Sequence, residues 1–173
     1  MIALGIDPAP SATGFIVLES ADKFPRVLFE DTAILTKMAG FERCSALAGR
    51  MIDILKEFEP DRVVIEGYGL NFKHPSSVIP LIEVGTILRY FLKQLEQDYL
   101  EPSPGELKKA VLGKGTGQKA AMMLQVFKRW HYEAKDDHRA DAYGLAAIGL
   151  AHGGRLRPTT LSIAEVASKL VLK

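Results

Sequence analysis

The stretch Met1-Ile2-Ala3-Leu4-Gly5-Ile6-Asp7-Pro8 decides how this chain folds. Its unbroken apolar run, closed by a carboxylate and a proline, is typical of a strand buried on both faces of a sheet. The turn-rich segment Pro8-Ala9-Pro10-Ser11-Ala12 follows, and so short a connection predicts that the next strand returns antiparallel to the first. Asp7 is therefore expected at the end of a central strand, where burying its charge is costly unless a partner neutralises it.

Working outward from this strand, the pattern predicts alternating strands and helices around one sheet. We expect strands at about 13–19, 26–35, 62–66 and 99–100, and helices at 41–58, 76–97, 103–111, 117–130 and 138–151. A meander of three strands followed by helix–strand units predicts an α/β fold with a mixed five-stranded sheet flanked by helices. We expect one domain over 1–157, and over 158–173 a short amphipathic segment packed on it.

Composition narrows the class of protein. A chain of 173 residues with 47% hydrophobic content can bury one core, and a net charge of +1 gives no overall sign of nucleic-acid binding. Cys44 is the single cysteine, which excludes an internal disulfide and fits a reducing compartment. The sequence begins without a basic region or a long apolar stretch, so we expect no signal peptide, no membrane span and a cytoplasmic location.

Four residues far apart in the sequence are placed to deliver metal ligands to one point. Asp7 and Glu66 each follow a buried strand, while His138 and Asp141 are spaced i, i+3 at a helix start and share one face. Oxygen-rich ligands favour Mg²⁺, and one imidazole makes Mn²⁺ a suitable substitute. Because a pair of such ions can activate water and stabilise phosphoryl charge, the pattern indicates a metal-dependent nuclease with two ions per active site.

Each of these residues also has a simpler interpretation. Asp7 could be a turn residue, and His138 with Asp141 could be a capping pair at the helix start. Asp136 and Asp137 compete for the cap and also for the metal, and Asp137 could face the metal if the helix begins early. His138 could also act as a general base, because its ordinary pKa is near neutral.

The charge of the chain is distributed as DNA binding requires. Between 103 and 135 only Glu106 and Glu133 oppose seven basic residues: Lys108, Lys109, Lys114, Lys119, Lys128, Arg129 and Lys135. A basic face opposite a more acidic one is therefore expected. Lys114 lies in the glycine-rich loop 113–117, which opens a helix and whose amides could hold a phosphate; it lacks the spacing of a P-loop.

Several segments together are similar to the RuvC family of Holliday junction resolvases, within the ribonuclease-H-like superfamily. The similar segments are Gly5-Ile6-Asp7-Pro8 with Thr13-Gly14, Val64-Ile65-Glu66, 111–115 with Lys119, and His138-Arg139-Ala140-Asp141-Ala142. They follow the family's order and spacing over about 1–152. The resemblance implies a ribonuclease-H-like nuclease domain and a Mg²⁺-dependent endonuclease acting on four-way or related branched DNA, with catalytic positions at Asp7, Glu66, His138 and Asp141.

The resemblance also implies how DNA is held. Lys108 and Lys119 would contact phosphates, and an aromatic residue after Glu66 would wedge against junction bases, with Tyr68 and Phe72 as candidates. This chain departs from the family at Ala9, where glycine is usual, and in the loop after Glu66. Two symmetric cuts imply a homodimer. The helix at 76–97 is the candidate interface, with an apolar stripe of Val78, Ile82, Ile87, Leu88 and Phe91 that would equally suit a core.

Two other classes of function share parts of this pattern. The Gly-Ile-Asp-Pro start with Thr13-Gly14 also resembles the first phosphate loop of actin and sugar-kinase ATPases, but such an ATPase needs two half-domains and the chain contains one. The second class is the YqgF-type ribosomal RNA processing nucleases, which are typically shorter. The basic block from Lys108 to Lys119 favours the junction resolvase over these RNA-processing nucleases.

Overall fold

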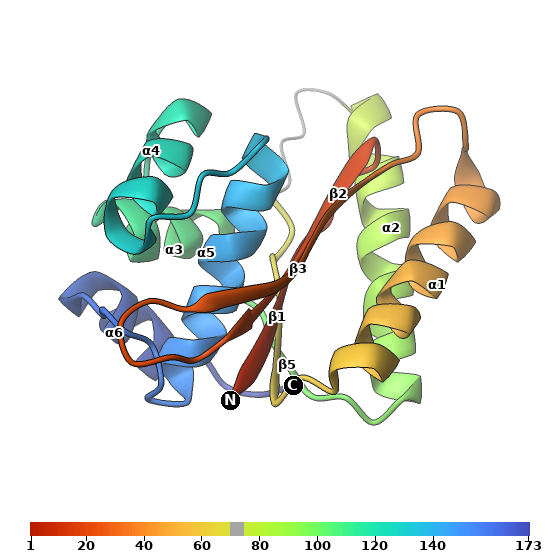
Figure 1. Ribbon diagram of the computed structural model, residues 1–173. Helices are drawn as coiled ribbons and strands as arrows, with labels where there is room; N and C mark the ends of the chain where they lie inside the picture. The colour runs from red at the N-terminus through yellow and green to blue at the C-terminus, as the bar shows by residue number, and fades with distance from the viewer. Residues whose placement is uncertain (70–74) are drawn as a thin grey trace.

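A central five-stranded sheet separates two layers of helices (Figure 1). The structure, a computed structural model, describes residues 1–69 and 75–173. In spatial order the strands are β3 (Arg26–Ile34), β2 (Ala12–Glu19), β1 (Ile2–Asp7), β4 (Arg62–Ile65) and β5 (Tyr99–Leu100). Strand β2 runs antiparallel to both of its neighbours, β3 and β1, whereas β4 runs parallel to β1 and to β5. The mixed five-stranded α/β sheet predicted from the sequence is confirmed.

Each face of the sheet carries its own apolar core. Helices α1 (Gly40–Phe58) and α2 (Pro75–Gln94) cover one face. The other face is covered by α3 (Pro104–Leu112), α4 (Lys119–Trp130), α5 (Asp137–His152) and α6 (Leu161–Lys169). Side chains of β1 alternate between the cores, with Leu4 and Ile6 on the α1–α2 side and Ala3 on the other. Both faces of the first strand are thus buried, as its apolar run predicts.

Helix α5 lies unusually close to the sheet because two glycines leave room for it. A Cβ atom at Gly5 of β1 would stand 2.0 Å from the carbonyl oxygen of Ala142, and one at Gly14 of β2 would stand 2.4 Å from that of His138. No side chain fits at either point, so glycine is required by close packing. This packing brings the N-terminal turn of α5 over the ends of β1 and β2.

The predicted element boundaries hold to within a few residues. Helix α2 ends three residues earlier than predicted, because the chain turns back with Glu96 in a left-handed conformation (φ 53°). Helix α4 begins two residues later, and α5 begins one residue earlier. Helix α6 buries Ile163 and Val166 in the core that α3 and α5 also line. None of the described helices is long and apolar enough to cross a membrane.

Candidate active site

The C-terminal ends of β1 and β4 bring Asp7 and Glu66 side by side. These strands are parallel with Ile6 opposite Ile65, so the next residue of each leaves the sheet at the same edge. The register continues past the last strand residue, because the Glu66 amide donates to the Ile6 carbonyl at 3.0 Å. Asp7 is only 6% exposed. The first two predicted ligands therefore share one edge of the sheet, as the sequence pattern predicts.

The first turn of α5 supplies the other two candidates from the facing layer. His138 Nδ1 lies 2.7 Å from Asp7 Oδ2, a hydrogen bond that joins residues 131 positions apart in the sequence. Asp141 follows one turn later on the same helix face and lies mostly buried beside the carboxylates of the strand ends. The structure thus gathers Asp7, Glu66, His138 and Asp141 at one end of the sheet.

Burial and mutual repulsion disfavour the charged forms of the carboxylates in this cluster. Burial, together with the nearby charges of Asp7 and Asp141, raises the pKa of Glu66 to about 8. Burial, with the charges of Asp7 and Asp137, likewise raises the pKa of Asp141 to about 7. The pKa of Asp7 is also raised by burial, against the opposing effect of the His138 hydrogen bond. Three acids in mutual repulsion, of which Asp7 is buried and Glu66 and Asp141 are partly buried, form an attractive site for a cation.

The two competing aspartates of α5 have other partners. Asp136 is the N-cap of the helix: its carboxylate accepts a hydrogen bond from the Arg139 amide at 2.8 Å and another from the Thr32 hydroxyl at 2.8 Å. Asp137 forms an ion pair with Lys119, and the hydrogen bond from Lys119 lowers the pKa of Asp137. Helix α5 does begin early enough for Asp137 to face the metal. The carboxylate of Asp137 nevertheless faces Lys119.

The donor set fits a hard divalent cation, although its ligands are not yet arranged around one. Within 1–69 and 75–173, no three His, Cys, Asp or Glu side chains form a ready-made metal-binding group. Asp7 is instead engaged by His138 at 2.7 Å. Carboxylates that raise one another's pKa lower their energy by sharing a cation, and their oxygens are the ligands that Mg²⁺ and Mn²⁺ prefer.

Two of the three lysines predicted to contact DNA lie beside the acidic cluster, and the third lies in an exposed loop. The charge of Lys108 lowers the pKa of both Glu66 and Asp141, so Lys108 lies near them. Lys119 pairs with Asp137 at the same end of the sheet. Lys114 is exposed in the loop between α3 and α4.

Other members of the basic block make contacts within the protein. Lys109 pairs with Glu165 at 2.8 Å, and Lys135 pairs with Glu30. Arg129 donates to the Ala110 carbonyl at 3.0 Å. The basic face is therefore smaller than its seven residues predict, because several of them are paired within the protein, and Lys108 and Lys119 are the two that lie near the acidic cluster.

The aromatic candidates for a DNA wedge differ in what the structure describes. Tyr68 packs against α2, with its ring 4.4 Å from the Arg89 guanidinium carbon and its hydroxyl 3.0 Å from the Thr86 hydroxyl. It is held against the protein rather than extended from it. Phe72 lies outside the described residues. A wedge role for either stays a prediction.

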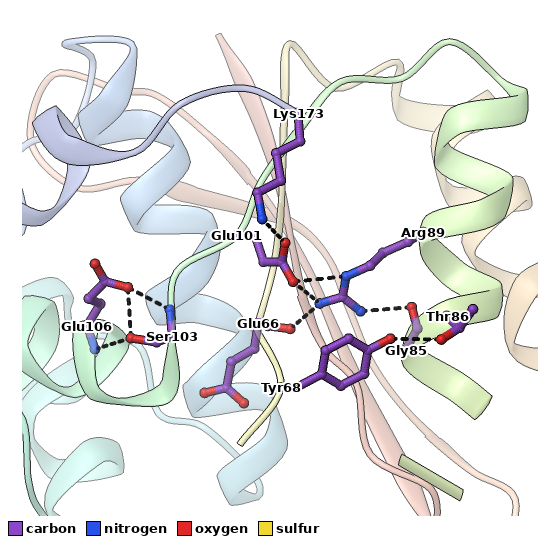
Figure 2. A network of polar contacts seen from close by, with 9 residues as sticks. All are labelled: Glu66, Tyr68, Gly85, Thr86, Arg89, Glu101, Ser103, Glu106 and Lys173. Carbon is purple, nitrogen blue, oxygen red and sulfur yellow. Dashed lines mark hydrogen bonds and ion pairs between the residues drawn. The ribbon is translucent and has the colours of Figure 1, made fainter. Parts of the chain in front are cut away.

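Sequence reasoning missed Arg89, which contacts the main chain of Glu66 (Figure 2). A basic residue in an apolar helical stretch was the available signal: Arg89 is the only basic residue within 75–92. It also missed the packing role of Gly5 and Gly14, for which glycine inside a strand pattern was the signal.

Comparison with known proteins gives one consistent family. The family model described as crossover junction endodeoxyribonuclease RuvC matches residues 3–152. The protein of that description from Campylobacter jejuni is 30% identical over 155 residues, covering 89% of this chain and 95% of the relative. The structure of Thermus thermophilus RuvC superimposes with a TM-score of 0.75 at 20% identity, over 90% of this chain and 98% of that chain. A second structure, of that RuvC in complex with a Holliday junction substrate, has the same TM-score of 0.75 at 21% identity and the same coverage of 90% and 98%.

Proposed function

This chain belongs to the RuvC family of crossover junction endodeoxyribonucleases, and from that premise we propose that it cuts four-way or related branched DNA by metal-dependent hydrolysis. The observation that carries the proposal is the gathering of three buried or partly buried carboxylates and one histidine at one end of the sheet. A module that only bound DNA would have no need of acidic groups at that position, since they repel phosphates.

We assign Asp7, Glu66, His138 and Asp141 to hold two Mg²⁺ ions, with Mn²⁺ as a substitute. Bound ions of this kind activate water and neutralise charge on the phosphoryl group. The chain's own contribution is to fix the positions of the ligands: two are anchored on parallel strands, and two on a helix packed against glycines. His138 directs Nδ1 toward Asp7, which leaves Nε2 for ligation or proton transfer.

We further propose that Lys108, Lys114 and Lys119 contact DNA phosphates, because Lys108 and Lys119 lie beside the acidic cluster, Lys114 is exposed in the loop between α3 and α4, and lysine acts as a mobile point charge. Residues 1–157 would form the nuclease domain, and 158–173 a C-terminal addition. Since branched DNA occurs with the chromosome, a cytoplasmic location suits this activity.

A homodimer is part of the proposal, because a junction offers two symmetric strands. Along α2, Val78 and Leu88 face the core, whereas Ile79 is 64% exposed and Ile82 is 41% exposed. With Phe41 of α1, 82% exposed, Ile79 and Ile82 line an apolar groove of about 490 Å³ between the two helices. This groove supports a contact between two copies, and sedimentation of the wild-type protein and of Ile82→Glu tests it.

The activity is tested by offering the purified protein several substrates in parallel. These are a four-way DNA junction, a linear duplex containing the same sequences, a structured RNA, and ATP, each with Mg²⁺ and with a chelator. We expect paired nicks in the four-way junction when Mg²⁺ is present, and no cleavage in the chelator. Cleavage of RNA in preference to the junction would favour the RNA-processing alternative, and ATP hydrolysis without DNA cleavage would favour the ATPase.

A further inference from the structure

We propose that Arg89 of α2 is a positioning residue that fixes where β4 delivers the carboxylate of Glu66. The inference rests on the proposed nuclease function, and it concerns a residue that stands outside the four expected ligands. Its guanidinium reaches the main chain at the point where β4 leaves the sheet (Figure 2).

The guanidinium of Arg89 joins three separate segments of the chain. Nη2 donates to the Glu66 carbonyl at 2.8 Å and to the Glu101 carboxylate at 2.8 Å, and Nε donates to the same carboxylate at 3.1 Å. Nη1 donates to the Gly85 carbonyl of α2 at 2.8 Å. The planar fork of arginine suits this task, since its donors point in fixed directions.

These contacts extend the pairing of β4 and β5 beyond their last strand residues. The two strands pair through Val64 and Leu100, and the Gly67 amide then donates to the Pro102 carbonyl at 2.8 Å. Arg89 links the same two segments between these points, through Glu66 and Glu101. Both segments are therefore tied to each other and to α2 at the residue that carries the ligand.

Glycine at position 85 makes the arrangement possible. A Cβ atom there would lie 2.6 Å from Tyr68 Cε1 and 2.9 Å from Arg89 Nη1. The bare helix backbone at Gly85 leaves a slot in which the Tyr68 ring lies against Arg89, 4.4 Å from the guanidinium carbon to the ring centre. Arg89 thus holds this segment in two ways, through the face of the Tyr68 ring and through the Glu66 carbonyl.

The geometry separates Arg89 from a DNA contact. Its side chain is only 12% exposed, and its donors already face oxygen atoms of the protein. Figure 2 shows the Glu66 carbonyl oxygen turned toward Arg89 and its carboxylate turned the other way. Arg89 therefore acts on the main chain that carries the ligand, and leaves the carboxylate free.

The test compares Arg89→Ala, Arg89→Lys and Gly85→Ala with a matched control, Arg50→Ala. Arg50 makes the same kinds of contact away from the site, an ion pair with Asp31 at 3.0 Å and a stack on Phe29 at 5.1 Å. Three quantities are measured on folded protein: kcat for junction cleavage, the Kd for the junction in chelator, and hydrogen exchange of the Gly67 amide without metal or DNA.

We expect Arg89→Ala to lower kcat about 10- to 100-fold while the Kd changes by no more than about twofold, because a small displacement of a catalytic group is costly. The Mg²⁺ concentration for half-maximal cleavage should rise, and Gly67 exchange should accelerate. Arg89→Lys should restore little, since an ammonium cannot span all three acceptors. Gly85→Ala should reproduce part of the loss, and Arg50→Ala none of it.

Unchanged kcat and unchanged Gly67 exchange in Arg89→Ala would overturn the inference. An equal loss of kcat in Arg50→Ala would overturn it too, because general destabilisation would then explain the effect. If the wild-type protein cleaves no junction, the proposed function fails, and Gly67 exchange still decides whether Arg89 holds the end of β4.

Discussion

The two sides of the end of β4 treat buried charge in opposite ways. On the β5 side, burial alone would raise the pKa of Glu101, but the hydrogen bond from Lys173 and the charge of Arg89 hold it below its usual value. On the β1 side, Glu66 and Asp141 lie among other acids, and their pKa values rise to about 8 and about 7. One cluster is electrostatically complete and the other is not.

The difference indicates which cluster stabilises the fold and which one binds something. A buried carboxylate with cationic partners needs no further ligand, so the Glu101 cluster serves the structure. Carboxylates whose burial and mutual repulsion outweigh their cationic neighbours destabilise the protein that holds them, and they are retained where a ligand supplies the missing charge.

Removing one acid from the incomplete cluster should abolish cleavage without harming the fold. We expect Asp7→Asn and Glu66→Gln each to lower kcat by about 1,000-fold or more, since each removes a metal ligand. Junction binding in chelator should persist, because the loss of negative charge relieves repulsion. Gel-shift and cleavage assays measure the two properties separately. Mg²⁺-dependent cutting retained in either variant would disprove the ligand assignment.

The α5 turn should distinguish His138 from its neighbour. His138→Ala is expected to lower kcat about 100-fold, and His138→Asp to retain part of the activity, because a carboxylate can replace imidazole as a ligand. Asp137→Asn should be mild, since Asp137 pairs with Lys119 and not with Asp7. If His138→Ala were active and Asp137→Asn inactive, Asp137 and not His138 would be the metal ligand.

The two clusters should respond to pH with opposite sign in the metal-free protein. Because the pKa of folded Glu66 is about 8, its ionisation opposes folding, and the free energy of unfolding falls as pH rises from about 4.3 through that value. We expect Glu66→Gln to stabilise the protein by about 1–3 kcal/mol near pH 8.5 and by little near pH 4.

Glu101→Gln is the matched control from the complete cluster. In the wild-type protein, folding lowers the pKa of Glu101. Its ionised form therefore stabilises the fold at pH values above the pKa of Glu101 in the unfolded chain, and that contribution is lost as pH falls. The Gln variant should therefore be less stable than the wild type at neutral pH. Urea unfolding across the pH range measures both variants, and stabilisation by Glu101→Gln would contradict the comparison.

The smallest effects are expected from the lysines beside the incomplete cluster. Lys108→Ala and Lys119→Ala should each weaken junction binding severalfold and make its salt dependence shallower by about one unit in the log–log slope. Lys109→Ala is the control, because Lys109 pairs with Glu165 at 2.8 Å. Equal salt slopes for all three variants and the wild type would show that Lys108 and Lys119 are solvated surface residues that do not contact DNA phosphates.

The sequence by itself determined the order of the elements and the two strand-end acids. An apolar run such as 1–7 reports burial directly, because burial of successive residues is a local property of a strand. Neighbouring parallel strands end at the same edge of a sheet, so Asp7 and Glu66 were expected together. The i, i+3 spacing at a predicted helix start added His138 and Asp141, and resemblance to a family pointed to the same two residues.

Only the tertiary structure decided how the charged residues are paired. Asp136, Asp137 and His138 are adjacent in sequence and chemically able to exchange roles, yet one caps the helix, one meets Lys119 and one meets Asp7. Arg89 was likewise unpredicted, since its acceptors come from three separate segments. Electrostatic and hydrogen-bond partners are fixed by distances of about 3 Å across the fold, which no local pattern of residues encodes.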